Sequence, residues 1–257
     1  MSHVRTQTTL SASYDLEERL HALDLGRVAA WHAFELATTV PVPVSTGSGL
    51  SQHLFDELVA SGVMREAHAG ERLTRRALYE PFAWTYPRDV GHAPALQAQL
   101  LRHFRAEVAR DGAQSALTEM WRRLADAEVR TYLGHLLRKH ALDPTDADTV
   151  VQAIADEWML HPLGRKRYLV WNAVRGAAAA LLKSNLDQAV ARQTLIEELR
   201  RRSRWLLLQE EARTLSASDY CFAPALGWRT PLLVRVLQEH WLAEPAAYWA
   251  LRPPTPE

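Results

Sequence analysis

Apolar residues recur at three- and four-residue spacings through most of the chain, which predicts a mainly helical fold. In the N-terminal part, this pattern predicts helices over residues 14–23, 26–39 and 50–61. Residues 40–49 hold two prolines and two glycines, so we expect an extended loop there. From residue 95 onward the helical spacing is almost continuous, which predicts a multi-helix bundle.

Two long apolar stripes define the first helices of this bundle. They are Leu96, Leu100, Phe104 and Val108, and then Leu117, Trp121, Leu124, Tyr132 and Leu136. Further helices are expected at residues 150–159, 168–183, 187–213 and 232–243, with a break at 161–164. Thr230-Pro231 and Pro245 supply the start and stop signals of the last helix.

The segment after the third helix predicts a β-hairpin. The helix ends at Ser61-Gly62, and short strands are expected at residues 63–66 and 72–79, around His68-Ala69-Gly70. Three helices followed by a hairpin is the order of a winged helix. The sequence therefore predicts a winged-helix-like module over residues 1–90 and a helical bundle with an aromatic C-terminal tail over residues 91–257.

A winged-helix-like module suggests nucleic-acid binding, and the residues of the wing fit that function better than the third helix does. The wing carries three arginines for phosphate contacts, namely Arg72, Arg75 and Arg76. On the helix, Gln52 is a candidate for reading adenine, but Asp56 and Glu57 beside it oppose phosphate. The alternatives are a protein-docking module and an ordinary helix and hairpin without a binding function.

A second candidate nucleic-acid site lies in a basic stretch of the bundle. Residues 161–205 hold ten basic and three acidic residues, whereas residues 106–160 hold six basic and ten acidic ones. Two groups of basic and aromatic residues could stack on bases or bind phosphate: Arg167, Trp171 and Arg175, and then Arg200, Arg201, Arg204 and Trp205. The alternative is a solvated, ion-paired helix face turned toward the acidic segment.

The whole-chain composition gives little support to a nucleic-acid-coating or membrane role. Thirty basic residues balance thirty acidic ones, and no apolar stretch is long enough to span a bilayer. Cys221 is the single cysteine, and the first nine residues lack the apolar core of a secretory signal. These features favour a cytoplasmic protein.

No arrangement typical of catalysis or of a cofactor emerges from the sequence, so we expect a non-enzyme without cofactor or metal. No phosphate-binding glycine loop occurs, and none of the eleven histidines has another at i+3 or i+4. Two weaker candidates are Glu128 with His135, and Asp156 and Glu157 with His161.

The sequence thus favours a DNA-binding or regulatory protein. The alternative is a non-catalytic subunit that docks a partner protein or a second copy of itself. The aromatic tail, with Tyr248, Trp249 and Leu251, either serves that docking or packs back on the bundle. The ligand, the oligomeric state and the pathway are not encoded in any motif.

Overall fold

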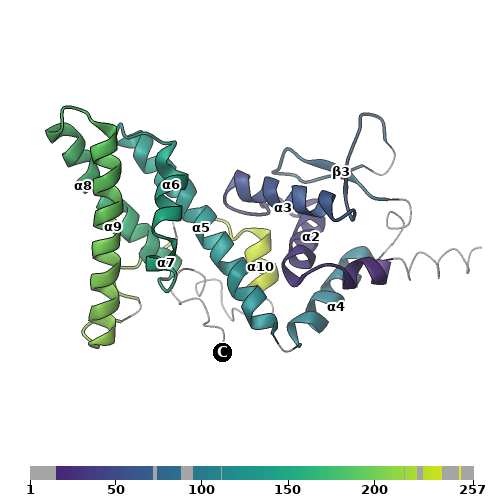
Figure 1. The fold of residues 1–257 in the computed structure, drawn as a ribbon. Helices are drawn as coiled ribbons and strands as arrows, with labels where there is room; N and C mark the ends of the chain where they lie inside the picture. The colour runs from purple at the N-terminus through teal and green to yellow at the C-terminus, as the bar shows by residue number, and fades with distance from the viewer. Residues whose placement is uncertain are drawn as a thin grey trace, which may run out of the picture. The chain divides into compact units, whose positions relative to one another are not determined.

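The computed structural model describes residues 16–71, 74–87, 95–110, 112–216, 218–224, 228–238 and 249. The fold is mainly helical with a small antiparallel sheet, as Figure 1 shows. Contacts divide the chain into two compact units, which are described separately below. The first unit takes in the described residues up to Met120, together with Arg229 and helix α10 (Leu232–Gln238). The second begins at Trp121 and includes Trp249.

The first unit begins with three helical segments at the predicted places. Residues 16–21 are helical, and α2 (Leu25–Ala37) and α3 (Ser48–Ala60) follow. Asp24 caps α2 by accepting a hydrogen bond from the backbone N–H of Arg27. Helix α2 is the centre of this unit, because it is buried along nearly its whole length and contacts α3, α4 (Leu96–Val108) and α10.

The loop between α2 and α3 is irregular, as its prolines predicted, and it caps the start of α10. The carbonyls of Pro43 and Val44 accept hydrogen bonds from the N–H groups of Leu232 and Leu233. These donors begin α10, where no carbonyl of the helix itself can reach them. The loop is held in turn by Glu80, whose carboxylate accepts from Ser51 Oγ and from the N–H of Val44.

The predicted hairpin of residues 63–66 and 72–79 is wrong in its pairing. Strands β1 (Arg65–Glu66) and β2 (Arg75–Arg76) both pair with β3 (Ala83–Thr85), in the order β1-β3-β2. The central strand lies between Pro81 and Pro87, in a passage for which no strand was predicted. The missed signal was the alternation of Phe82, Trp84 and Tyr86, which puts three buried aromatic side chains on one face.

Those aromatic side chains form the core between the sheet and α2. Phe34 contacts the rings of Phe55, Phe82 and Trp84 at centroid distances of 5.7–6.0 Å. Tyr86 Oη donates to the buried Glu35 carboxylate and accepts from the indole N–H groups of Trp31 and Trp84. Burial raises the pKa of Glu35 above its usual 4.5, although the bond from Tyr86 opposes this shift.

The second unit is a helical bundle, as predicted. It contains the part of α5 (Ala113–Lys139) from Trp121 on, followed by α6 (Asp146–Ala153), α7 (Ala155–Trp158), α8 (Leu163–Lys183) and α9 (Gln188–Glu211). Helices α8 and α9 form its most extensive packing contact. The predicted start of α8 at residue 168 is wrong, because Pro162 caps the helix and Gly164 lies within its first turn. The proposed boundary at residue 90 falls within the first unit, and whether residues 1–90 fold independently stays a prediction.

Tyr86→Phe is expected to destabilise the protein by about 3 kcal/mol, because it leaves a buried carboxylate and two indole N–H groups without their partner. Urea unfolding followed by tryptophan fluorescence measures this loss. Tyr79→Phe is the matched control, since Tyr79 is exposed and should change stability by less than about 0.5 kcal/mol. Equal stabilities for the two variants would contradict the assigned role of Tyr86.

Candidate functional site

The basic stretch expected on the surface begins instead with a buried cluster. Gly164, Arg165, Lys166 and Arg167, here called the basic junction, lie in the first turns of α8. Cations near a helix N-terminus are unfavourable toward the helix dipole, so their burial requires nearby carboxylates. Each of the three cations has one, supplied from elsewhere in the second unit.

Arg165 fastens the loop that follows α9. Its fully buried guanidinium forms an ion pair with Glu210, with 2.7 Å between Nη1 and Oε1. It also donates to the backbone carbonyls of Ser216, at 2.7 Å, and Asp219, at 2.9 and 3.1 Å. Satisfying several donors of one guanidinium this way fixes the loop against α8.

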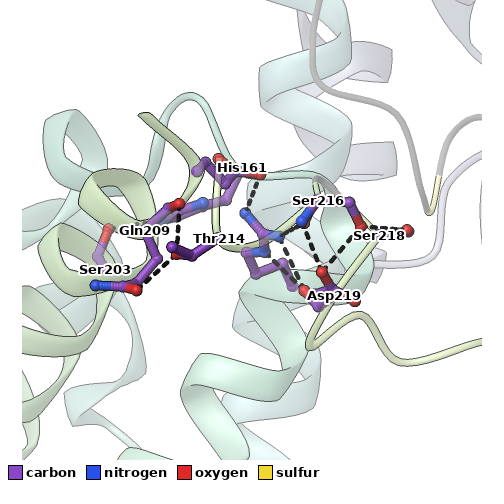
Figure 2. A network of polar contacts seen from close by, with 9 residues as sticks. His161, Ser203, Gln209, Thr214, Ser216, Ser218 and Asp219 are labelled. Carbon is purple, nitrogen blue, oxygen red and sulfur yellow. Dashed lines mark hydrogen bonds and ion pairs between the residues drawn. The ribbon is translucent and has the colours of Figure 1, made fainter. Parts of the chain in front are cut away.

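The loop has further bonds of its own, drawn in Figure 2. The Asp219 carboxylate accepts from the N–H and the hydroxyl of Ser216. Thr214 Oγ1 donates to Gln209 at the end of α9. Phe222 N–H donates to the carbonyl of Gly164, so the loop is tied to α8 at both its ends.

Lys166 and Arg167 lie against other helices. Lys166, 1% exposed, is 2.9 Å from Asp126 and rests over the rings of Trp121 and Trp158. Burial lowers the pKa of its ammonium below 10.5, while Asp126 raises it. Arg167 pairs with Glu128 at 2.9 Å, so this predicted nucleic-acid contact lies in an internal ion pair.

The rings around Arg167 account for one residue of the predicted aromatic tail. The guanidinium lies 4.0 Å from the ring centre of Tyr132 and 4.9 Å from that of Trp249. Trp249 is only 2% exposed and contacts Trp228 edge-on. It therefore packs back on the second unit, while Tyr248 and Leu251 lie outside the described residues.

The other predicted arginines of the bundle remain near the surface but have acidic partners. Arg200 bonds Glu157 at 2.9 Å, and Arg204 lies 3.9 Å from the same carboxylate. Arg201 pairs with Glu198 at 2.7 Å. The basic stretch thus faces the acidic segment through Arg200, as the ion-paired alternative expected.

A run of contacting aromatic side chains joins the two predicted Arg–Trp groups. We call it the aromatic surface, made up of Trp171, Tyr168, Phe222, Tyr220 and Trp205. Neighbouring ring centres lie 5.1–6.2 Å apart. Trp205 is 47% and Tyr220 43% exposed, and Leu208, one turn beyond Trp205 on α9, is exposed as well.

Arg175 extends the aromatic surface along α8. Its guanidinium lies 4.8 Å from the ring centre of Trp171, as the four-residue spacing predicted. It is exposed, and no carboxylate of the described chain lies within ion-pair distance of it. The surface therefore offers one cation to a ligand beside its rings.

In the first unit, only some of the predicted nucleic-acid contacts are engaged by other side chains. Arg75 and Arg76 are exposed on the edge strand β2, with no carboxylate of the described residues in ion-pair distance. Gln52 is exposed on α3, but its amide donates to Asp56 at 2.8 Å. Arg72 lies outside the described residues.

The two catalytic candidates do not come together as acid–base pairs. Glu128 pairs with Arg167, and His135 is exposed. The buried His161 Nε2 lies 2.9 Å from Ser203 Oγ, but that hydroxyl donates to the carbonyl of Glu157 at 2.6 Å. Ser203 Oγ must therefore accept from His161, which makes the histidine a donor and not a base toward the serine. Asp156 is exposed to solvent.

Within the described ranges, no group of three or more histidine, cysteine or acidic residues is placed to hold a metal ion. No helix in that part of the chain has the length and apolar character needed to cross a membrane. Searches with family models, curated proteins and solved structures found no match to this chain. The function must therefore be argued from the residues.

The sequence reasoning missed three members of the aromatic surface. Tyr168 was detectable, because it lies three residues before Trp171 on one helix. Tyr220 and Phe222 lie in an irregular loop after α9, where no periodicity marks an orientation. Their position follows from the buried Arg165, whose partners are 51 and 54 residues away along the chain.

Gly164→Ala is expected to destabilise the protein by about 2 kcal/mol or more. A Cβ there would lie 2.5 Å from the carbonyl oxygen of Phe222 and 3.0 Å from that of Trp249. Gly176→Ala in the same helix is the matched control, because its Cβ would meet only Glu198 Cγ at an ordinary 3.6 Å. The control should gain up to about 1 kcal/mol from helix propensity. Urea unfolding of both variants checks the opposite signs, and a stabilised Gly164→Ala would contradict the tight approach.

Proposed function

We propose that this chain is a non-catalytic interaction protein whose second unit binds a partner protein through the aromatic surface. The observation that supports this best is the continuous run of rings that ends in two exposed members, Trp205 and Tyr220. Large aromatic side chains carry much of the binding energy of protein interfaces, and arginine is enriched beside them. Arg175 supplies that arginine.

The charges near the surface favour a protein over a nucleic acid. Arg200, Arg201 and Arg204 each lie within ion-pair distance of Glu157 or Glu198, so these cations are partly neutralised within the chain. Nucleic-acid binding depends on cations that replace the counterions of phosphate. A partner that places apolar side chains on the rings and a carboxylate on Arg175 needs only the one unpaired cation.

The anchoring of the loop also suits binding. Tyr220 and Phe222 belong to the segment that Arg165 and Gly164 hold against α8. A surface that is ordered before binding loses less conformational entropy when the partner arrives. The basic junction thereby contributes to recognition without touching the partner.

The double variant Trp205→Ala/Tyr220→Ala is expected to weaken partner binding at least about thirtyfold, the loss typical of interface hot spots. Affinity purification of the full chain from its source cells, followed by titration of the recovered partner, measures this loss. Leu182→Ala is the control, because Leu182 is exposed and outside the aromatic surface. Recovery of the same proteins by the double variant would contradict the proposal.

The same variants distinguish a protein partner from a nucleic acid bound at this surface. Fluorescence anisotropy with a single-stranded oligonucleotide at low salt should show no binding that depends on Trp205 and Tyr220. Salt-sensitive binding that the double variant abolishes would show a nucleic-acid site in place of a protein site. Sedimentation of the purified chain reports whether the partner is a second copy.

As a second function, we propose that the first unit is a winged-helix-like module that contacts duplex phosphate. The order of three helices and then a sheet is that of a winged helix. The specific support is Arg75 and Arg76 on the edge strand, both exposed and neither within ion-pair distance of a carboxylate of the described residues. On α3, Gln52 and His53 are engaged with Asp56 and Glu57, which favours phosphate contact over base reading.

Arg75→Ala/Arg76→Ala is expected to reduce the salt dependence of duplex binding, by about 0.9 in log–log slope for each phosphate that the variant no longer neutralises. Arg65→Ala on β1 is the matched control, since Arg65 already pairs with Glu71 at 2.7 Å. Anisotropy titrations over a range of salt concentrations measure the slopes. A wild-type chain that binds no long duplex at low salt would contradict this second function.

A cytoplasmic location completes the proposal, since nothing in the described chain depends on an oxidised cysteine. Cys221 is a half-buried thiol in the loop held by Arg165, outside any disulfide of the described residues.

A further inference from the structure

A small cavity of about 310 Å³ lies in the first unit, between the helical residues 16–21 and α4. This volume is at the lower end of the range for small-molecule sites, about 300–1,000 Å³. The lining residues from α4 recur at intervals of three and four, so they lie on one face of that helix. The cavity shares no lining residue with the aromatic surface or with strand β2.

The polar side chains of the cavity have both signs of charge. Glu107 is committed, because its carboxylate lies 2.5 Å from Arg110. Glu17 and Arg102 also line the cavity, and neither has an ion-pair partner among the residues that the structure describes. One carboxylate and one guanidinium are thus available to a ligand.

His103 provides an unsatisfied buried group at the same place. Its side chain is 10% exposed, and its Nε2 has no hydrogen-bond partner in the described chain. The imidazole also interacts with the backbone of Leu20, and the ring of His21 lies edge-on at 5.1 Å. Burial lowers the pKa of His103 below its usual 6.5, which favours the neutral imidazole, and a neutral imidazole has one nitrogen that accepts a hydrogen bond. A buried acceptor without a donor is the kind of group that a ligand satisfies.

We propose that this cavity binds a small zwitterion of the α-amino acid class. The ligand carboxylate would lie on Arg102, in the bidentate geometry that a guanidinium offers. The ligand ammonium would lie near Glu17 and donate to His103 Nε2. Leu20 and Ala106, which also line the cavity, would contact the ligand side chain. A simple anion fits less well, because Glu17 and Glu107 would repel it.

The test is isothermal titration of the full chain with each of the twenty protein amino acids in free form. At least one is expected to bind, and its methyl ester, which lacks the carboxylate, and its N-acetyl derivative, which lacks the ammonium, are expected not to. Arg102→Gln and Glu17→Gln should each weaken binding about 10–100-fold. Arg105→Gln and Glu18→Gln are matched controls, because both residues are exposed neighbours that do not line this cavity.

The proposal is overturned if no free amino acid binds, if the blocked derivatives bind equally well, or if Arg102→Gln and Glu17→Gln bind like the wild type. Titration with zinc chloride tests whether the cavity is a metal site instead. Zinc binding that is lost in His21→Ala and His103→Ala, without amino acid binding, would show a metal site and also overturn the proposal. Circular dichroism of each variant confirms that the fold is retained, which is expected because Glu17 and Arg102 are exposed.

Discussion

Two consecutive cations, Arg165 and Lys166, are removed from water at the start of α8, with Arg167 partly buried beside them, and the second unit is arranged around these three. Removing one partner from a buried ion pair typically costs about 3–5 kcal/mol, because the other charge is left uncompensated. Each cation therefore requires its own partner on a different element, and these partners come from α5 and α9. Gly164, just before them, lets the backbone of Phe222 approach α8 where any side chain would block it.

This constraint links the core of the second unit to its surface. The guanidinium that balances Glu210 also holds the carbonyls of the loop after α9, and that loop carries two rings of the aromatic surface. The exposed Trp205 and Tyr220 are thus part of an ordered surface, supported from beneath by a buried charge. The first unit is built on a comparable principle, since Tyr86 satisfies the buried Glu35 and two indole groups at once.

Much of the fold followed from the sequence, because a stripe of apolar residues is a local signal. The stripes ending at Val108 and Leu136 became α4 and α5, and the prolines around residue 42 marked a true loop. Strand β3 was not predicted, because Pro81 and Pro87 on either side argue against a strand although Phe82, Trp84 and Tyr86 alternate. Short strands carry little signal of their own, and their pairing depends on partners elsewhere in the chain.

The basic stretch shows where local reasoning fails. A run such as Arg-Lys-Arg is normally solvated, and only the fold brings Asp126 to Lys166 across 40 residues of sequence. Arg200 likewise bonds Glu157 across 43 residues of sequence, while Arg201 pairs with Glu198 within α9, which weakens the case for phosphate and strengthens the case for a protein partner. The Trp171–Arg175 stack was predictable because both residues lie on one helix face.

The burial of the basic junction can be tested directly, because the chain has only three lysines. Lys139 and Lys183 are exposed, whereas Lys166 is enclosed by Trp121 and Trp158. The measurement is amine acetylation of the native protein, followed site by site with mass spectrometry. Lys139 and Lys183 should react rapidly, and Lys166 should react only when the protein unfolds, even though its lowered pKa favours the reactive amine. Acetylation of Lys166 in the native protein as fast as at the other two sites would contradict the buried junction.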